Sequence, residues 1–305
     1  MSLLRLTAPA LALFASACAS PAPTPEAAAP VTIRFAAEFA GKPFACGQSY
    51  NLGSPAVAAT PSDMRFYVSE VALVRADGTA VPVALDTDNR WQANGVALLD
   101  FEDGTGPCAA GGSAATNTAL RGTAPAGSYT GLRFTVGVPV AQNHQDATVA
   151  GAPLNVTAMF WNWQNGYKFL KADLAVPGAT MHGAARVAAP GHSPGQGYAL
   201  HIGSTQCAAA APTRPGTDCR NANRMAISLD GFEAARDVVV LDLAPALARI
   251  DLRRNTAGTP PGCMSFPNDP ECRLVMPPLG LAYADVPADP QLVFAARRSA
   301  AMAAR

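Results

Sequence analysis

Residues 63–85 read DMRFYVSEVALVRADGTAVPVAL and decide the class of fold. β-Branched and aromatic residues are frequent in residues 64–75, as expected of a β-strand. Asp77-Gly78 is a dipeptide typical of tight hairpin turns, and a second strand-like run follows in residues 79–85. The stretch therefore predicts two strands joined by a hairpin turn.

The same pattern recurs along most of the chain. Residues 31–39 alternate apolar with polar or small side chains, which is the period of a half-buried strand. Other predicted strands are residues 96–101, 129–138, 198–203, 225–229 and 238–243. One short helix is expected within residues 243–252. Many strands and few helices predict an all-β fold, an antiparallel β-sandwich or barrel with long irregular loops.

The N-terminus has the layout of an export signal. Arg5 precedes an apolar run in residues 6–17, which is too short for a membrane-spanning helix of about 20 residues. The small residues before Cys18 resemble a lipobox, in which the cysteine is lipidated, and plain cleavage near residue 17 or 19 is the alternative. Residues 1–18 are therefore predicted to send the chain to the periplasm, with a membrane contact only through a lipid on Cys18.

Composition separates a tether from a folded body. Residues 19–30 are almost only Ala, Pro, Ser and Thr, and they predict an extended tether. Residues 31–305 contain no sharp linker and are expected to form one domain with a Pro-rich C-terminal extension. The chain carries 22 basic and 22 acidic residues without a Lys/Arg cluster. We therefore expect no nucleic-acid partner.

The cysteines predict a disulfide framework. Six of the seven follow Cys18, namely Cys46, Cys108, Cys207, Cys219, Cys263 and Cys272. An even number in an exported chain predicts three disulfides. Sequence proximity favours Cys207 with Cys219 and Cys263 with Cys272, which leaves Cys46 with Cys108, although six cysteines permit many other pairings. The absence of a C-x-x-C spacing gives little support to a thiolate zinc site.

One sequence motif suggests a hydrolase. Residues 191–195, GHSPG, fit the G-x-S-x-G pattern of serine hydrolases. That motif needs a buried strand before the serine and a helix after it, because the sharp turn between them presents the hydroxyl. Pro190 and Pro194 flank the serine and disfavour both elements. We interpret the stretch as a loop and do not expect an enzyme.

The histidines are better candidates for a functional site. His144, His182, His192 and His201 are the four in the chain. Neutral imidazole is a good ligand for copper, zinc, iron or nickel. His144 lies in a polar loop after a predicted strand, and His201 points away from the apolar face of its strand. These two are the leading ligands, with the others in reserve, and separate non-ligating histidines are the alternative because no H-x-H or H-E-x-x-H motif is present.

Two of the three tryptophans lie in residues 159–169, MFWNWQNGYKF. In an extended segment, Trp161 and Trp163 share a face. Packing in the core is the favoured interpretation from residue type alone, since aromatic side chains supply much of the buried area of a domain. The segment by itself indicates no substrate.

Several strings together resemble a known family. They are FACG at residues 44–47, DMRFYVS at 63–69, the segment 159–169, HIGSTQC at 201–207 and the region from Cys263 to Cys272. All are similar to the MbnP-like proteins, also called metallo-mystery pair four-Cys motif proteins. W-x-W-x-x-G-Y-K-F and H-x-G-S-T-x-C are the most distinctive, and the similarity extends over nearly the whole chain after the tether.

The resemblance implies a periplasmic copper-binding protein without catalytic turnover. It also implies a di-haem cytochrome c peroxidase-like partner that oxidises one tryptophan to kynurenine, a side chain that accompanies histidine at the copper site. Trp161 and Trp163 are both candidates, and the nearby Gly166 turn slightly favours Trp163. A structural or adhesive β-domain lipoprotein with no metal is the alternative function. The family name refers to four cysteines, whereas this chain has six after Cys18.

Overall fold

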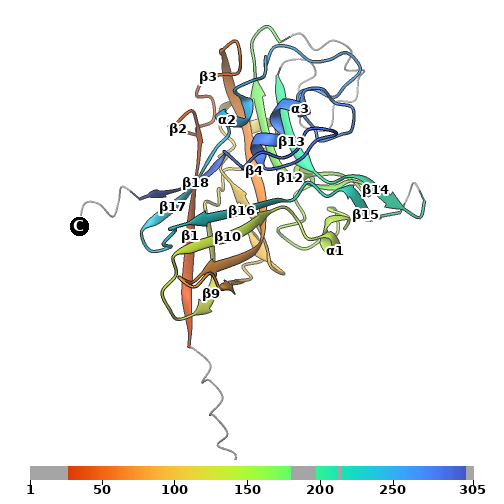
Figure 1. The fold of residues 1–305 in the computed structure, drawn as a ribbon. Coiled ribbons are helices and arrows are strands. Elements are labelled where there is room, and N and C mark those ends of the chain that lie inside the picture. Colours follow the sequence, from red (N-terminus) through yellow and green to blue (C-terminus); the bar gives the residue numbers. More distant parts are fainter. Residues whose placement is uncertain (1–26, 180–196, 212–213, 300–305) are drawn as a thin grey trace, which may run out of the picture.

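A computed structural model describes residues 27–179, 197–211 and 214–299 (Figure 1). Within these residues, the strands form a six-stranded sheet, a ten-stranded sheet and a two-stranded ribbon. The all-β prediction is confirmed, and the sheets do not close into a barrel. No helix in this described part has the length and apolar character needed to cross a bilayer.

The six-stranded sheet contains the first and the last strands. Its order is β18 (Phe294–Arg298), β17 (Asp237–Asp242), β1 (Ala28–Phe39), β9 (Ala119–Pro125) and β6 (Ala84–Leu85), with β2 (Lys42–Pro43) paired to β1. Strand β1 begins at Ala28, so the last residues of the predicted tether belong to it. β1 and β17 run parallel, in contrast to the antiparallel prediction, because the long chain between them supplies the crossover that parallel strands require.

The ten-stranded sheet is organised around one long strand. Its order is β11 (Phe160–Asn162), β12 (Gly166–Ala175), β4 (Val57–Val74), β10 (Gly131–Val136) and β16 (Met225–Asp230). β13 (Tyr198–Gly203) pairs with β12; β3 (Tyr50–Leu52), β5 (Ala80–Pro82) and β8 (Val96–Asp100) pair with β4; and β7 (Gln92–Ala93) pairs with β8. The predicted hairpin turn is confirmed, because β5 returns along β4 and Asp77 Oδ1 accepts a 2.9 Å bond from the Thr79 amide.

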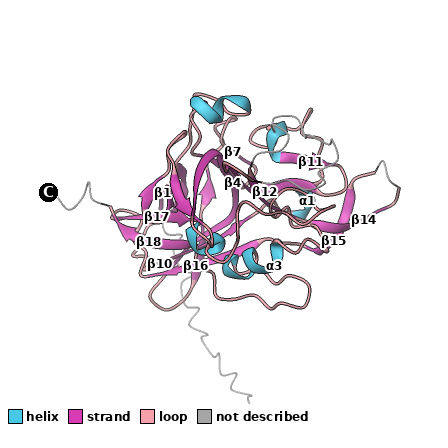
Figure 2. Ribbon diagram, turned by 90° about the horizontal axis from the view of Figure 1, so that it is seen from above, coloured by secondary structure: helices cyan, strands magenta, loops and turns pink. Residues whose placement is uncertain are grey.

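The remaining elements are short. β14 (Thr205–Ala209) and β15 (Gly216–Asn221) form the ribbon, which projects from one side of the molecule in both views (Figures 1 and 2). The helices are α1 (Val140–Asn143), α2 (Ala244–Leu247) and α3 (Cys272–Val275), with 3-10 turns η1 (Gly106–Ala110), η2 (Thr157–Met159) and η3 (Pro277–Leu279). The predicted short helix is confirmed as α2.

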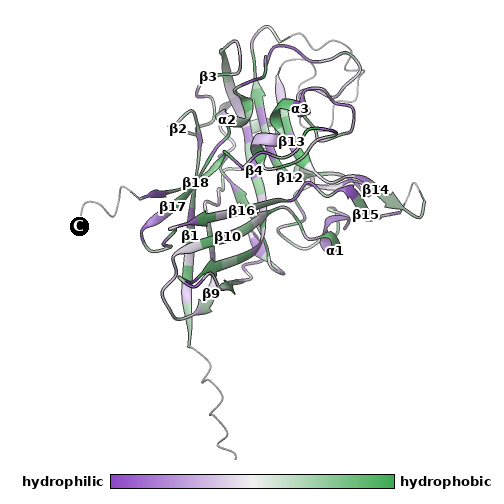
Figure 3. Ribbon diagram, viewed as in Figure 1, coloured by the Kyte–Doolittle hydropathy of each residue, from purple (hydrophilic) through white to green (hydrophobic). Residues whose placement is uncertain are grey.

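The main core lies between the two sheets. Phe35 of β1 contacts Phe66 of β4 and Phe134 of β10 edge-on, with ring centroids 6.0 and 5.7 Å apart. A second apolar cluster lies on the other face of the large sheet, where Tyr67 packs edge-on against Tyr167 at 5.7 Å. Burial on both faces explains why the central strands are apolar along most of their length (Figure 3).

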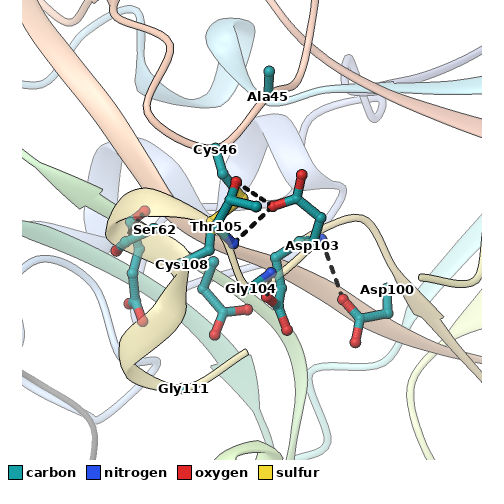
Figure 4. Close-up of a disulfide and its surroundings, with 12 residues drawn as sticks. Ala45, Cys46, Ser62, Asp100, Asp103, Gly104, Thr105, Cys108 and Gly111 are labelled. Atoms are coloured by element: carbon teal, nitrogen blue, oxygen red, sulfur yellow. Dashed lines mark hydrogen bonds between the residues drawn. A yellow bond between two sulfur atoms is a disulfide. The ribbon is translucent and has the colours of Figure 1, made fainter. Parts of the chain in front are cut away.

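Three disulfides hold the loops, and their pairing is the one that sequence proximity favoured. They join Cys46 to Cys108, Cys207 to Cys219 and Cys263 to Cys272. The first crosses 62 residues and fastens η1 to the loop after β2 (Figure 4). Beside it, the Thr105 amide and hydroxyl donate to Asp103 Oδ1 at 2.9 and 2.6 Å, which orders the loop that leads into η1.

Removing the Cys46–Cys108 disulfide by a double alanine substitution is expected to lower the free energy of unfolding by about 2–5 kcal/mol. The Cys207–Cys219 double variant should lose less, because its bridge closes a loop of 12 residues rather than 62. Urea denaturation of the three proteins measures both losses. Free thiols in the unfolded, unreduced protein that lacks residues 1–18 would contradict the framework.

Candidate metal centre

His201 lies in the middle of β13, on the face that points away from the main core. Tyr198, Leu200 and Ile202 of the same strand point into that core, as the sequence predicted. β13 pairs with β12, and His201 lies opposite Lys171. The imidazole is 1 % exposed, so its polar atoms need partners inside the protein.

Asp173 of β12 provides one such partner. His201 Nε2 is 2.7 Å from Asp173 Oδ1. A carboxylate can only accept, so Nε2 carries the proton and the lone pair lies on Nδ1. Burial lowers the pKa of His201 to about 4, although the charge of Asp173 opposes this shift. The imidazole is therefore neutral near pH 7 and is oriented by a carboxylate, as in many metal-ligating histidines.

A row of buried charges holds Asp173 in place. Its other oxygen, Oδ2, is 2.7 Å from Lys171 Nζ. Lys171 also bonds to Asp63 of β4, and Asp63 receives a second ion pair from Arg65. Together with His201, these four side chains lie on one face of three neighbouring strands. Each charge has an opposite charge beside it, which is what allows them to be buried.

Trp161 of β11 lies over Gly203 of β13, two residues from His201. A Cβ placed on Gly203 would come within 2.5 Å of Cζ3 of the Trp161 ring, so the indole fills the space that a side chain at position 203 would take. Residues 201 and 203 lie on the same face of β13, about 7 Å apart along the strand. The ring of Phe266 packs on Trp161 with centroids 5.3 Å apart. Trp161 thus covers the position two residues from His201 on this face.

His144 occupies a second place, directly after α1. It is 6 % exposed, and burial lowers its pKa, although a hydrogen bond to the Trp163 backbone opposes this. Its Nδ1 lies 3.2 Å from the Trp163 carbonyl oxygen, and Nε2 lies 3.3 Å from Asn143 Nδ2. The Trp163 side chain itself is 44 % exposed. Trp163 therefore contacts the histidine through its backbone, with its indole near solvent.

The ribbon brings two sulfur atoms to His144. Three potential ligand atoms, one each from His144, Cys207 and Cys219, lie within 4.8 Å of one another. Among the described residues, no other group of three or more His, Cys, Asp or Glu side chains lies this close together. The cysteines form a disulfide, however, so neither sulfur is a thiolate. In this oxidised state the group offers a metal only the imidazole.

Comparison with known proteins identifies the family of this chain. The family model described as MbnP matches residues 28–265, which include both histidine positions and both tryptophans. The chain belongs to the MbnP family. A solved structure described as MbnP from Methylosinus trichosporium is similar to this chain, with a TM-score of 0.77 and 32% identity, and covers 90% of this chain and 100% of its own length. No match was found among curated proteins.

The leading histidines of this MbnP-family chain lie at separate places. Asn143, the residue before His144, packs against Gly166 at the start of β12, because a Cβ there would meet its backbone at 2.2 Å. His201 pairs with Lys171, roughly 16 Å further along β12 at about 3.3 Å per residue. The structure brings Trp161 over the strand that carries His201, and His144 to the backbone of Trp163. His182, His192 and the GHSPG motif lie outside the described residues.

The sequence interpretation missed the residues that support His201. Asp63, Arg65, Lys171 and Asp173 occur within apolar strands, and charged residues in such a context are rare unless they are paired. That signal could have indicated a polar site on this face. The role of Gly203 had no comparable signal, because the close approach of Trp161 depends on how β11 folds over β13.

Gly203→Ala is expected to displace the Trp161 indole and to destabilise the fold by about 1–3 kcal/mol, since the added methyl overpacks a filled space. The methyl would also lie 2.6 Å from the Tyr167 carbonyl oxygen. Gly151→Ala is the matched control, because nothing lies within 4 Å of a Cβ there. Urea denaturation and near-ultraviolet circular dichroism measure both effects. Equal stability of the two variants would contradict the packing.

Proposed function

We propose that this chain is a copper-binding protein of the bacterial envelope, without catalytic turnover, and that His201 is a copper ligand. The observation that carries the proposal is the placement of Trp161 over Gly203, two residues from His201 on the same face of β13. A neutral imidazole oriented by a carboxylate and an oxidisable aromatic ring thus share one face of this strand.

The donor chemistry of the described residues fits copper. The imidazole of His201 is neutral, and Asp173 fixes its orientation. The six cysteines of the body are oxidised, so thiolates that would favour zinc sites are absent from the described residues. Nitrogen-rich sites bind copper more tightly than the other divalent first-row metals. Further ligands are proposed from His182 and His192, with His144 as a separate candidate.

Trp161 is proposed as the tryptophan that becomes kynurenine. Indole nitrogen is only a hydrogen-bond donor, whereas kynurenine carries an aromatic amine with a lone pair. The oxidation adds two oxygen atoms across the indole double bond, and hydrolysis then releases one carbon as formate. A di-haem cytochrome c peroxidase-like partner is the proposed catalyst, with two molecules of hydrogen peroxide as the oxidant, which supply the two oxygen atoms and are reduced to water. The sequence slightly favoured Trp163, but Trp163 is 44 % exposed, while the indole of Trp161 covers Gly203 on the face of β13 that carries His201.

The proposed location is the periplasm. The disulfides support it, because such bridges persist in oxidising compartments. The signal segment and Cys18 lie outside the described residues, and lipidation of Cys18 remains part of the proposal.

A metal-free structural protein is the competing function. The ion pairs around Asp173 give His201 a role in packing even without copper. In that case the row of charges only fixes how β4, β12 and β13 pair.

The first test compares copper affinity in alanine variants of the four histidines. His201→Ala should cause the largest loss, and Asp173→Asn should weaken binding by about 10–100-fold through the orientation of the imidazole. Affinity should decline with acidity only as the pH approaches about 4, the pKa of His201, because protonation below that value removes the ligand. Competition titration with a copper chelator gives these affinities. Unchanged binding in all four variants would show that the histidines are not the site, and a wild-type chain that binds no copper would favour the metal-free function.

The second test follows the tryptophan. Protein made together with the di-haem partner should show a net gain of one oxygen and loss of one carbon in the peptide 159–168, and protein made alone should not. Trp161→Phe should abolish this mass change, and Trp163→Phe is the matched control that should retain it. Peptide mass spectrometry measures the change. Modification that persists in Trp161→Phe would move the assignment to Trp163.

A further inference from the structure

The loop between Cys263 and Cys272 packs on β13 and contacts the backbone of His201. The Cys263 amide donates to the Ala199 carbonyl at 2.8 Å, and the His201 amide donates to the Cys263 carbonyl at 2.9 Å. The disulfide and α3 close the other end of the loop. Two carboxylates, Asp269 and Glu271, lie within this fastened segment.

Each carboxylate uses one oxygen in the fold and leaves the other buried without a partner. Asp269 Oδ1 accepts a 3.1 Å bond from the Glu271 amide. Glu271 Oε1 accepts bonds from the Thr256 amide and hydroxyl at 2.7 and 2.8 Å. Asp269 Oδ2 and Glu271 Oε2 are buried and have no hydrogen-bond partner. The two carboxyl groups interact with each other, and neither free oxygen has a donor.

A third oxygen comes from the neighbouring strand. Tyr198 of β13 is 2 % exposed, and its hydroxyl has no hydrogen-bond partner. Buried tyrosine hydroxyls usually find one. Burial raises the pKa of Tyr198, and the charges of Asp269 and Glu271 raise it further, so the hydroxyl lies within the field of the pair. Tyr198 is thus a third buried group with an unpartnered oxygen, and the charges of the pair act on it.

The charge of the pair also lacks compensation. Among the described residues, neither Asp269 nor Glu271 forms an ion pair with a basic side chain. Burial, together with the neighbouring Glu271, raises the pKa of Asp269 to about 7. Asp269 is buried and Glu271 is half-buried, and uncompensated carboxylates in such places are costly. The pair therefore requires either a bound cation or a shared proton.

We propose that Asp269, Glu271 and Tyr198 form a calcium site. All three offer hard oxygen donors and no nitrogen or sulfur, which suits Ca²⁺ and disfavours copper. Backbone carbonyls and water complete the coordination of such ions in flexible loops. The expected dissociation constant is about 10⁻⁴–10⁻³ M, the range of extracellular modules. This site is independent of the proposed copper function.

The ion would fasten the loop that supports β13. Within that loop, the Ser265 hydroxyl donates to the His201 carbonyl at 2.9 Å and accepts from the Gly203 amide at 3.3 Å. Calcium would therefore stabilise the loop on which the positions of His201 and Gly203 depend, without contact with either side chain.

The test uses the full mature chain after treatment with a chelator. Calorimetric titration with CaCl₂ should show one Ca²⁺ per chain, and thermal unfolding should shift to higher temperature with Ca²⁺ and less with Mg²⁺. Asp269→Asn and Glu271→Gln should lose the binding and the shift. Asp289→Asn, an exposed carboxylate nearby in sequence, is the matched control and should keep both.

Tyr198→Phe removes only the hydroxyl and should weaken calcium binding by about tenfold while the fold persists, so the test holds even if the acidic variants do not fold. Two results would overturn the proposal. The first is that the wild-type chain binds no calcium and Asp269→Asn is more stable than the wild type. This result would show that Asp269 and Glu271 share a proton instead of a cation. The other is equal binding in wild type and Asp269→Asn, which would place the ion elsewhere.

Discussion

The ion pairs that join β4, β12 and β13 fix the register on which the site depends. Asp63 bonds to Lys171, Lys171 to Asp173, and Asp173 to His201. Side chains alternate between faces along a strand, so a slip of one residue would move these charges into the apolar core and leave them without partners. The network therefore tolerates one pairing of the strands, and this pairing places His201 opposite Lys171 with its ring oriented.

The contacts around β13 explain several residues of the two most distinctive sequence motifs. In H-x-G-S-T, the glycine at position 203 leaves space for Trp161, and the Thr205 hydroxyl donates to the Ser265 carbonyl at 3.2 Å. In W-x-W-x-x-G-Y-K-F, Tyr167 donates to the Leu154 carbonyl at 2.6 Å and Lys168 to the Ala158 carbonyl at 2.7 Å. Residues of the two strings therefore pack against each other through Trp161 and Gly203. The hydrogen bonds of Tyr167 and Lys168 position the segment that precedes Trp161.

The disulfides serve different parts of this unit. The Cys207–Cys219 bridge holds the ribbon whose Cys219 sulfur lies 3.5 Å from His144 Nε2. The Cys263–Cys272 bridge fastens the loop behind β13, where Phe266 packs on Trp161. The bridges reduce the conformational freedom of the unfolded chain, and they hold loops that have few regular hydrogen bonds of their own. A largely irregular C-terminal region can thus support a defined site.

The sequence by itself determined many of the strands, the turn at Asp77-Gly78 and the family, and it favoured the correct disulfide pairing, because these depend on local pattern, proximity and distinctive strings. It did not predict β9, β12 or the two strands of the ribbon. It identified His201 as pointing away from the core, since alternation along one strand is a local property. Only the tertiary structure decided that Trp161 covers Gly203 near His201, that His144 lies elsewhere and that β1 pairs in parallel with β17. Those relations join segments far apart in the chain, and which segments meet is set by packing and charge pairing across strands, which no single segment encodes.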